Sequence, residues 1–269
     1  MRVLLIGAAG VAALYLVIVA GFVLLQRNLM YLPSNANPPP ETLGLSGVSV
    51  HDLPTPDGER VVLWYAPAAP GHPTILFLHG NGGEVASRAD RFAAYRDLGF
   101  GVAFLSWRGY GGSSGRPTER GLLTDARTAY DWVIGAGVAP EDLAVIGESL
   151  GTGIAVQLAA DVPVGAVVLG APYSAAVDVA ADLYPFLPVR LLMFDQFRSI
   201  DHIRAITAPI LIQHGTEDRI IPYHSGRALY AAAGDNATFV TLDGMGHEAL
   251  YIQSTWETEA AFLRDVLSP

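Results

Sequence analysis

The sequence contains no cysteine and no lysine. Without cysteine the chain forms no disulfide, has no thiol nucleophile and offers no thiolate to a metal. Its 16 basic residues are all arginine, against 26 acidic residues, and the formal net charge is −10. Long basic runs, the electrostatic mark of nucleic-acid-binding proteins, are missing too. We therefore expect neither a nucleic-acid partner nor cysteine chemistry.

Charge is also missing from a long stretch near the start of the chain. Residues 3–25, VLLIGAAGVAALYLVIVAGFVLL, carry no charged side chain. A hydrocarbon core of about 30 Å needs about 20 helical residues, so this segment is long enough to span a bilayer. A cleaved signal peptide competes with this interpretation, but its apolar core is usually only ~7–15 residues. Bulky residues 22–26 also stand where cleavage is expected. We predict an uncleaved transmembrane anchor over residues 1–30.

The charges around this segment indicate its orientation. The N-terminal amine and Arg2 precede it, only Arg27 follows closely, and the next basic residue is Arg60. Positive charge favours the cytoplasmic side of a membrane. By a margin of one charge, the sequence favours a cytoplasmic N-terminus and an extracytoplasmic domain.

After a proline-rich segment that predicts an extended linker (31–41), apolar runs alternate with longer amphipathic stretches. This alternation predicts an α/β domain over residues 42–269, with a mostly parallel sheet covered by helices on both faces. The expected strands are Val61–Ala66, Thr74–Leu78, Gly101–Leu105, Leu143–Ile146, Ala166–Leu169, Ile210–Gln213 and Thr238–Leu242. The expected helices are Val85–Leu98, Glu119–Ile134, Leu150–Ala160, Ser225–Ala233 and His247–Val266.

Residues 172–207 interrupt the alternation where a short connector is expected. The segment is rich in leucine, aromatic residues and proline. We interpret it as a lid inserted over one end of the sheet. There are two alternatives for its apolar side chains: they line an acyl pocket, or they pack the lid onto the domain. They are Tyr173, Leu183, Tyr184, Phe186, Leu187, Leu191, Leu192, Met193, Phe194 and Phe197.

The stretch VIGESLGTG contains a G-x-S-x-G pattern centred on Ser149. A sharp turn between a strand and a helix holds such a serine in a strained conformation and exposes its hydroxyl above the sheet. The neighbouring glycines allow the strand and helix to pass close to each other. The pattern alone is common, but here an apolar run precedes it and a helical stretch follows it. We predict that Ser149 is a nucleophile.

A neutral serine hydroxyl needs a base, which is usually histidine. In this architecture the order is serine, acid, histidine. His247 fits best, because it follows the last expected strand in the glycine-containing loop DGMGHEAL. His214 ends a strand and is expected to bond within its own loop, whereas His202 and His224 are expected to be residues of the surface or of the insertion.

The acid should orient the imidazole and stabilise its charged form. Asp218 follows the expected strand Ile210–Gln213, on the carboxyl side where sites of open α/β sheets lie. Glu217 and Asp243 are the alternatives. The non-catalytic explanation for Glu217 is a solvated surface charge. For Asp243 it is the capping of a turn at the end of a strand.

The stretch LFLHGNGGE supplies the expected oxyanion site. A tetrahedral oxyanion needs preorganised N–H donors, and losing one typically costs ~10²–10³ in rate. The predicted donors are the backbone N–H groups of Asn81 and Leu150. A phosphate-binding loop is the other interpretation of GNGG, but the required spacing and lysine are absent.

Taken together, these motifs resemble the α/β-hydrolase superfamily, and more narrowly the serine hydrolases of the Bem46/ABHD13–ABHD17 type. The matching stretches run from about residue 61 to 267 and include SWRGYGGSSGRPTERGLLTDARTAYDWV and APILIQHGTEDRIIP. Ser106 stands where relatives commonly have aspartate. The resemblance implies Ser149 as nucleophile, Asp218 as acid, His247 as base, and the two backbone donors. It also implies an N-terminal membrane segment.

The chemistry expected from these residues is two-step acyl transfer to water, acting on a small or lipid-like ester or thioester without metal or organic cofactor. An amidase or peptidase on the same fold and a non-catalytic membrane-tethered scaffold are the alternatives. Arg108 is expected either to contact an acidic substrate group or to form a structural ion pair.

Overall fold

A sheet of eight strands runs through the centre of the protein. The computed structural model describes residues 1–267. The strands lie in the order β10-β9-β8-β7-β4-β6-β3-β2. Neighbours from β10 to β6 are parallel, whereas β3 is antiparallel to β6 and β2 is antiparallel to β3. Their bounds are β2 (Ser49–Pro54), β3 (Arg60–Ala66), β4 (Thr74–Leu78), β6 (Gly101–Ser106), β7 (Leu143–Glu148), β8 (Ala166–Gly170), β9 (Ile210–Gly215) and β10 (Ala237–Leu242).

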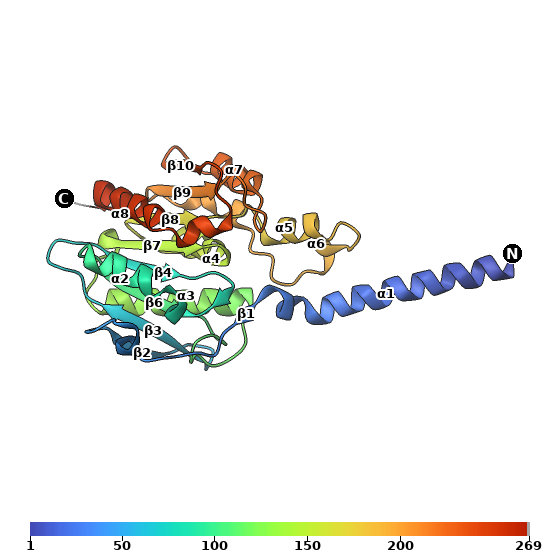
Figure 1. Cartoon of the computed structure of the whole chain (residues 1–269), viewed down its shortest axis with the longest axis horizontal. Coiled ribbons are helices and arrows are strands. Elements are labelled where there is room, and N and C mark those ends of the chain that lie inside the picture. Colours follow the sequence, from blue (N-terminus) through green and yellow to red (C-terminus); the bar gives the residue numbers. More distant parts are fainter. Residues whose placement is uncertain (268–269) are drawn as a thin grey trace.

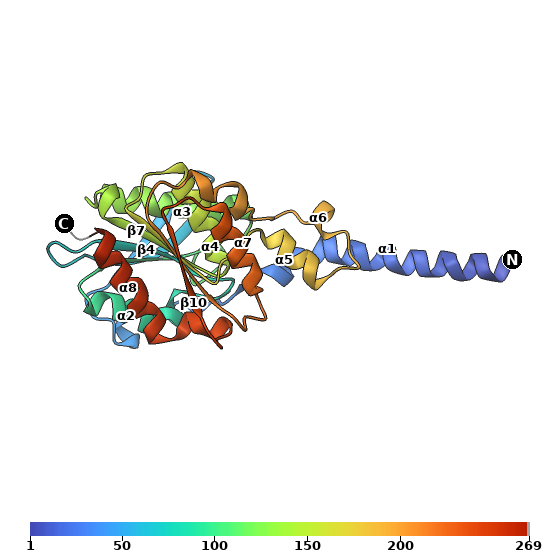
Figure 2. The same ribbon diagram turned by 90° about the horizontal axis from the view of Figure 1, so that it is seen from above.

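The helices cover both faces of this sheet (Figure 2). One side carries α2 (Ala89–Asp97) and α8 (Gln253–Leu267), and the other carries α3 (Glu119–Gly135), α4 (Leu150–Asp161) and α7 (Tyr223–Ala232). Every residue of β4, β6, β7 and β8 is buried. Strands enclosed on both sides read as continuous apolar runs, which is why the sequence located them. The predicted mostly parallel α/β architecture is confirmed.

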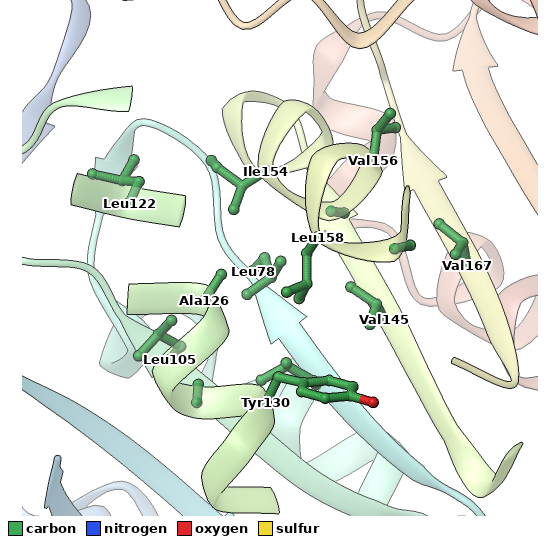
Figure 3. Close-up of a cluster of buried hydrophobic side chains, with 14 of the residues drawn as sticks. Leu78, Leu105, Leu122, Ala126, Tyr130, Val145, Ile154, Val156, Leu158 and Val167 are labelled. Carbon is green, nitrogen blue, oxygen red and sulfur yellow. The ribbon is translucent and has the colours of Figure 1, made fainter. Parts of the chain in front are cut away.

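Two large apolar clusters fill the spaces on either face of the sheet. Figure 3 shows part of the first, where side chains of α3 and α4 meet those of the strands. Fully burying one such leucine or valine side chain contributes about 1.5–3 kcal/mol. These contacts hold α4 against the sheet and therefore fix the turn that precedes it. The labelled side chains are Leu78, Leu105, Leu122, Ala126, Tyr130, Val145, Ile154, Val156, Leu158 and Val167.

The structure differs from the sequence prediction at three elements. Strand β2 was not expected, because its sequence SVHDLP is polar and ends in proline, and only Leu53 is buried. The expected helix over residues 247–266 is two elements, the 3₁₀ helix η6 (His247–Tyr251) and α8. The expected helix over residues 85–98 likewise begins as the 3₁₀ helix η2 (Val85–Arg88) and continues as α2.

An N-terminal helix, α1 (Arg2–Met30), projects away from the domain (Figure 1). It is long and apolar enough to cross a membrane. The segment after it packs on the domain, because β1 (Leu32–Pro33) pairs in parallel with β5 (Gly82–Gly83). Tyr31 is buried, and the 3₁₀ helix η1 (Pro40–Leu43) ends the segment. The stretch expected as an extended linker is thus attached to the loop that follows β4.

Residues 172–207, which we call the lid, contain α5 (Ala176–Leu183), α6 (Val189–Leu192) and the 3₁₀ helices η4 (Ser199–Asp201) and η5 (Ile203–Ala205). Helices α5 and α6 lie beside α1 on the same side of the domain (Figures 1 and 2). The lid therefore meets the N-terminal helix at the carboxyl ends of the sheet strands.

Candidate active site

Ser149 occupies the turn between β7 and α4. Its backbone has φ 52° and ψ −116°, a region that residues with a Cβ rarely adopt. Such conformations cost about 1–3 kcal/mol and persist only where the surroundings impose them. A Cβ on Gly147 would lie 2.7 Å from the Gly151 carbonyl oxygen, and one on Gly151 would lie 2.0 Å from that of Leu78. Both glycines are therefore required for the turn to form.

His247 and Asp218 lie next to this serine, although they are far from it in the chain. His247 Nε2 is 3.1 Å from Ser149 Oγ, and His247 Nδ1 is 2.7 Å from Asp218 Oδ2. Asp218 follows β9, and His247 begins η6 after β10. Parallel neighbours place these two loops at the same edge of the sheet as the turn at Ser149. The structure brings together all three side chains predicted from the sequence.

The other oxygen of Asp218 accepts hydrogen bonds from the backbone N–H groups of Ile220 and Ile221, at 2.8 and 2.9 Å. Burial raises the pKa of Asp218, but hydrogen bonds from His214 and His247 outweigh it and hold the pKa well below its usual range. The carboxylate is therefore ionised beside the His247 imidazole. It is suited to orient Nδ1–H and to stabilise an imidazolium.

His214 contributes to this site in a way that the sequence did not indicate. Its Nε2 is 2.9 Å from the Ile221 carbonyl oxygen, so the expected bond within its own loop is confirmed. The same nitrogen lies 3.5 Å from Asp218 Oδ2. A second imidazole thus lies beside the carboxylate, near the oxygen that faces His247. Only the closing of the Gly215–Ile221 loop brings the two side chains together.

The two predicted oxyanion donors lie beside Ser149. Leu150 is the first residue of α4, so its N–H has no partner within the helix and lies at the positive end of the helix dipole. Asn81 follows β4, and both residues line the same cavity as Ser149. The Asn81 carbonyl accepts from the Tyr110 hydroxyl at 2.8 Å, and its side chain donates to the Met30 carbonyl at 3.0 Å. These bonds fix the peptide units around Asn81.

His79, in the same loop, is fully buried. Burial, with the nearby Arg88 guanidinium, lowers its pKa to about 3. Its Nδ1 lies 2.7 Å from the Gly80 carbonyl oxygen. A neutral imidazole therefore supports the loop without adding a charge near Ser149.

A buried network of charges lies under the turn at Ser149. Glu148, the residue before Ser149, pairs with Arg88 at 2.7 Å and with Arg91 at 3.3 Å. Arg91 also pairs with Glu259 at 2.6 Å. Arg88 in turn donates to the Gly82 carbonyl at 2.7 Å, in the loop that carries Asn81. Sequence reasoning missed this network because its members come from η2, α2, β7 and α8 and share no local pattern.

The cavity above Ser149 has a volume of about 220 Å³. Of the ten apolar residues singled out in the lid, Tyr173, Leu183, Tyr184 and Met193 line it. Phe197 is instead part of the core, and several others are exposed. The apolar side chains of the lid thus divide between lining this cavity and packing on the domain, and Tyr173 does both.

Arg108 lies outside this cavity and pairs with Asp125 and Asp57, each at 2.7 Å. The structural ion pair expected from the sequence is confirmed. Over residues 1–267, no group of three or more histidine, aspartate or glutamate side chains is arranged to hold a metal ion.

Strand-to-helix serine turns on a sheet of this topology characterise the α/β hydrolases. A family model described as "alpha/beta hydrolase fold" matches residues 73–199, and one described as "Serine aminopeptidase, S33" matches residues 193–251. The chain therefore belongs to the α/β-hydrolase family, and its relatives support this assignment.

An uncharacterized protein of Mycobacterium tuberculosis is 39% identical over 225 residues, which cover 82% of this chain and 80% of that protein. Human "Alpha/beta hydrolase domain-containing protein 17B" is 32% identical over 72% of this chain and 67% of its own length. The rat "Lysophosphatidylserine lipase ABHD12" is 32% identical over 66% of this chain, but the match spans only 50% of the lipase. The Pyrococcus furiosus esterase Pf2001 has the same fold, with a TM-score of 0.71 over 89% of this chain and 99% of its own, at 17% identity.

Proposed function

We propose that the protein is a membrane-anchored serine hydrolase that cleaves carboxylic ester or thioester bonds. The observation that carries the proposal is the hydrogen-bonded chain from Ser149 Oγ through the His247 imidazole to Asp218, with contacts of 3.1 and 2.7 Å. The lipase and esterase activities named for two similar proteins support the bond type.

In the first half of the proposed reaction, His247 Nε2 takes the Ser149 proton as Oγ attacks the carbonyl carbon. The N–H groups of Asn81 and Leu150 stabilise the resulting oxyanion. The imidazolium then gives its proton to the leaving alcohol or thiol, and the acyl group stays on Ser149. Asp218 stabilises the positive charge on His247 throughout this step.

In the second half, His247 removes a proton from water as the water oxygen attacks the acyl carbon. Collapse of the second tetrahedral intermediate returns the proton to Ser149 Oγ and releases the carboxylic acid. No oxidant, metal or organic cofactor takes part in either half.

Helix α1 is proposed to anchor the domain in the membrane as a single span, with residues 31–41 joining it to the hydrolase domain. The N-terminal amine and Arg2 exceed Arg27 by one positive charge, which supports an extracytoplasmic domain. Protease treatment of intact spheroplasts tests this orientation: the domain should be degraded without lysis. Protection until the membrane is opened would reverse the orientation.

Labelling with a fluorophosphonate probe tests the nucleophile. The wild type should be labelled and Ser149→Ala should not, whereas Ser254→Ala, an exposed serine on α8, should label like the wild type. Labelling that survives Ser149→Ala contradicts the proposed nucleophile.

A substrate panel then tests the bond type. Esters and acyl-thioesters should be hydrolysed faster than an aminoacyl anilide, which is included because of the match to a serine aminopeptidase model. Preference for the anilide would favour the amidase alternative.

A further inference from the structure

The end of α1 is packed into the lid. Gln26, in an otherwise apolar helix, is buried and accepts from the Phe194 backbone N–H at 2.8 Å while donating to the Leu192 carbonyl at 3.1 Å. Phe22 and Met30 pack against a small apolar cluster of the lid. Because Gln26 satisfies backbone groups of the lid, the helix and the lid form one folded unit.

This packing makes α1 one wall of the active-site cavity. Ser149 and the proposed oxyanion donors line this cavity together with residues of α5. The residues from α1 are Phe22, Gln26, Arg27, Leu29 and Met30. An acyl chain attached at Ser149 would therefore lie between the lid and the apolar N-terminal helix.

The lid follows α1 well beyond the cavity. The Tyr15 hydroxyl donates to the Phe186 carbonyl at 3.0 Å. Tyr15 lies twelve positions before Arg27, which at ~1.5 Å per residue places it about 18 Å further along the helix. The uncharged stretch of residues 3–25 is about 35 Å long by the same measure. The tip of the lid thus lies about half-way along the stretch that spans the membrane.

The lid exposes large apolar side chains from its tip back to the end of α1, where Phe194 contacts Gln26 and Arg27. Leu183, Phe186, Leu191 and Phe194 are 58%, 62%, 85% and 59% exposed. A cluster of this kind marks a surface that contacts something other than water. A bilayer is the occupant that fits, because α5 and α6 lie beside α1 (Figure 1) and the apolar side chains of α1 are themselves exposed.

The polar groups of the tip are compatible with this environment. Lipid-exposed carbonyl groups need a partner, and the Tyr15 hydroxyl supplies one to Phe186. Arg190 pairs with Asp178 at 3.0 Å, and its long apolar stem allows the guanidinium to reach the headgroup level.

We infer that the lid tip inserts into the bilayer beside α1, and that the cavity opens between them into the hydrocarbon. A single-chain lipid ester then reaches Ser149 from within the leaflet, acyl chain first, without crossing water. This inference rests on the proposed hydrolase function for the reaction, but not for the insertion of the lid.

The first test compares two substrates of the full-length protein in phosphatidylcholine vesicles. Leu191→Asp should lower kcat/KM at least tenfold for a long-chain ester carried in the bilayer, and change it less than twofold for soluble p-nitrophenyl butyrate. Val50→Asp, at an exposed apolar position on edge strand β2, is the matched control and should change neither. Equal turnover of the bilayer ester by Leu191→Asp and the wild type would overturn the inference.

The second test is independent of catalysis and exploits the absence of cysteine. An environment-sensitive dye on Leu191→Cys should shift to the blue in vesicles and be quenched by spin-labelled lipid, while the same dye on Val50→Cys should not. Quenching of the Leu191→Cys dye by aqueous iodide alone would overturn the insertion. If the wild type hydrolyses neither ester while the dye is quenched by lipid, the proposed function fails and the insertion stands.

Discussion

Arg27, in the last turn of α1, forms a two-pronged ion pair with Asp195 of the lid, with contacts of 2.8 and 3.1 Å. The Asp195 carboxylate also accepts from the Tyr31 hydroxyl and from the backbone N–H of Glu119, each at 3.1 Å. Its side chain is 7% exposed, whereas that of Arg27 is 45% exposed. One nearly buried carboxylate therefore joins the N-terminal helix, the lid and the start of α3 beside the cavity.

Asp195→Asn should loosen this junction, because a neutral amide cannot accept all four hydrogen bonds as a carboxylate does. Hydrogen bonds to charged groups contribute about 1.5–3 kcal/mol, and we expect a loss nearer the lower value because water screens Arg27. Thermal unfolding of the detergent-solubilised chain, with limited proteolysis of the lid, measures the effect. Asp201→Asn, which breaks an exposed pair with Arg198 on the same lid, is the control. Equal melting temperatures for the two variants would contradict the role of Asp195.

Gly151→Ala should impair both stability and activity. The added methyl group would lie 2.0 Å from the Leu78 carbonyl oxygen, so α4 has to move away from β4 and carry the Leu150 N–H with it. Overpacking of this kind typically costs about 1–3 kcal/mol, and we expect at least a tenfold loss in kcat/KM for p-nitrophenyl butyrate. Gly135→Ala, at the end of α3 where a methyl group meets no atom within 4 Å, is the control and should retain full activity. Full activity of Gly151→Ala would show that the turn tolerates a wider separation of α4 from β4.

Glu148→Gln should destabilise the fold strongly. The substitution leaves Arg88 and Arg91 buried with one carboxylate fewer, and breaking a buried ion pair from one side costs about 3–5 kcal/mol. Urea unfolding in detergent should show this loss as a lower midpoint. Asp131→Asn, which breaks an exposed pair with Arg127 on α3, should change the midpoint little. A midpoint for Glu148→Gln close to that of Asp131→Asn would mean that water replaces the missing charge.

The stabilising effect of Asp218 should depend on pH. Because its folded pKa is depressed, the folded state favours the ionised carboxylate more than the unfolded chain does. This contribution is complete above the unfolded pKa of about 4 and is lost as the pH falls through the folded pKa. The difference in melting temperature between the wild type and Asp218→Asn should therefore shrink as the pH is lowered from about 5 to about 2. A difference that stays constant over this range would show that Asp218 gains no such stabilisation.

Asp218→Asn should also lower kcat/KM at neutral pH, on the order of 10³–10⁴-fold, because the amide stabilises neither the correct tautomer nor the imidazolium of His247. Ester hydrolysis with purified protein measures this loss. Asp243→Asn is the control and should leave activity within twofold of the wild type. If Asp243→Asn were the more damaging change, the acid would have to be reassigned.

Much of the fold was readable from local patterns. The buried strands are continuous apolar runs. The G-E-S-L-G turn stands between one of these strands and a helix, so both elements next to Ser149 were predictable from the sequence. Edge strand β2 was not, because four of its six residues are exposed and its pattern resembles a loop. The order of Ser149, Asp218 and His247 along the chain was likewise visible, although Glu217 and Asp243 remained as alternatives for the acid.

By itself, the sequence determined the class of fold, the long apolar N-terminal helix and the turn at Ser149, since each depends on residues that are neighbours in the chain. Only the tertiary structure decided which carboxylate faces His247, which charges lie under Ser149, and that the N-terminal helix walls the cavity. Those contacts join segments up to 168 positions apart, as between Arg27 and Asp195. The physical reason is that periodicity encodes which face of an element is buried, whereas the pairing of polar groups depends on which elements the folded sheet brings to the same edge.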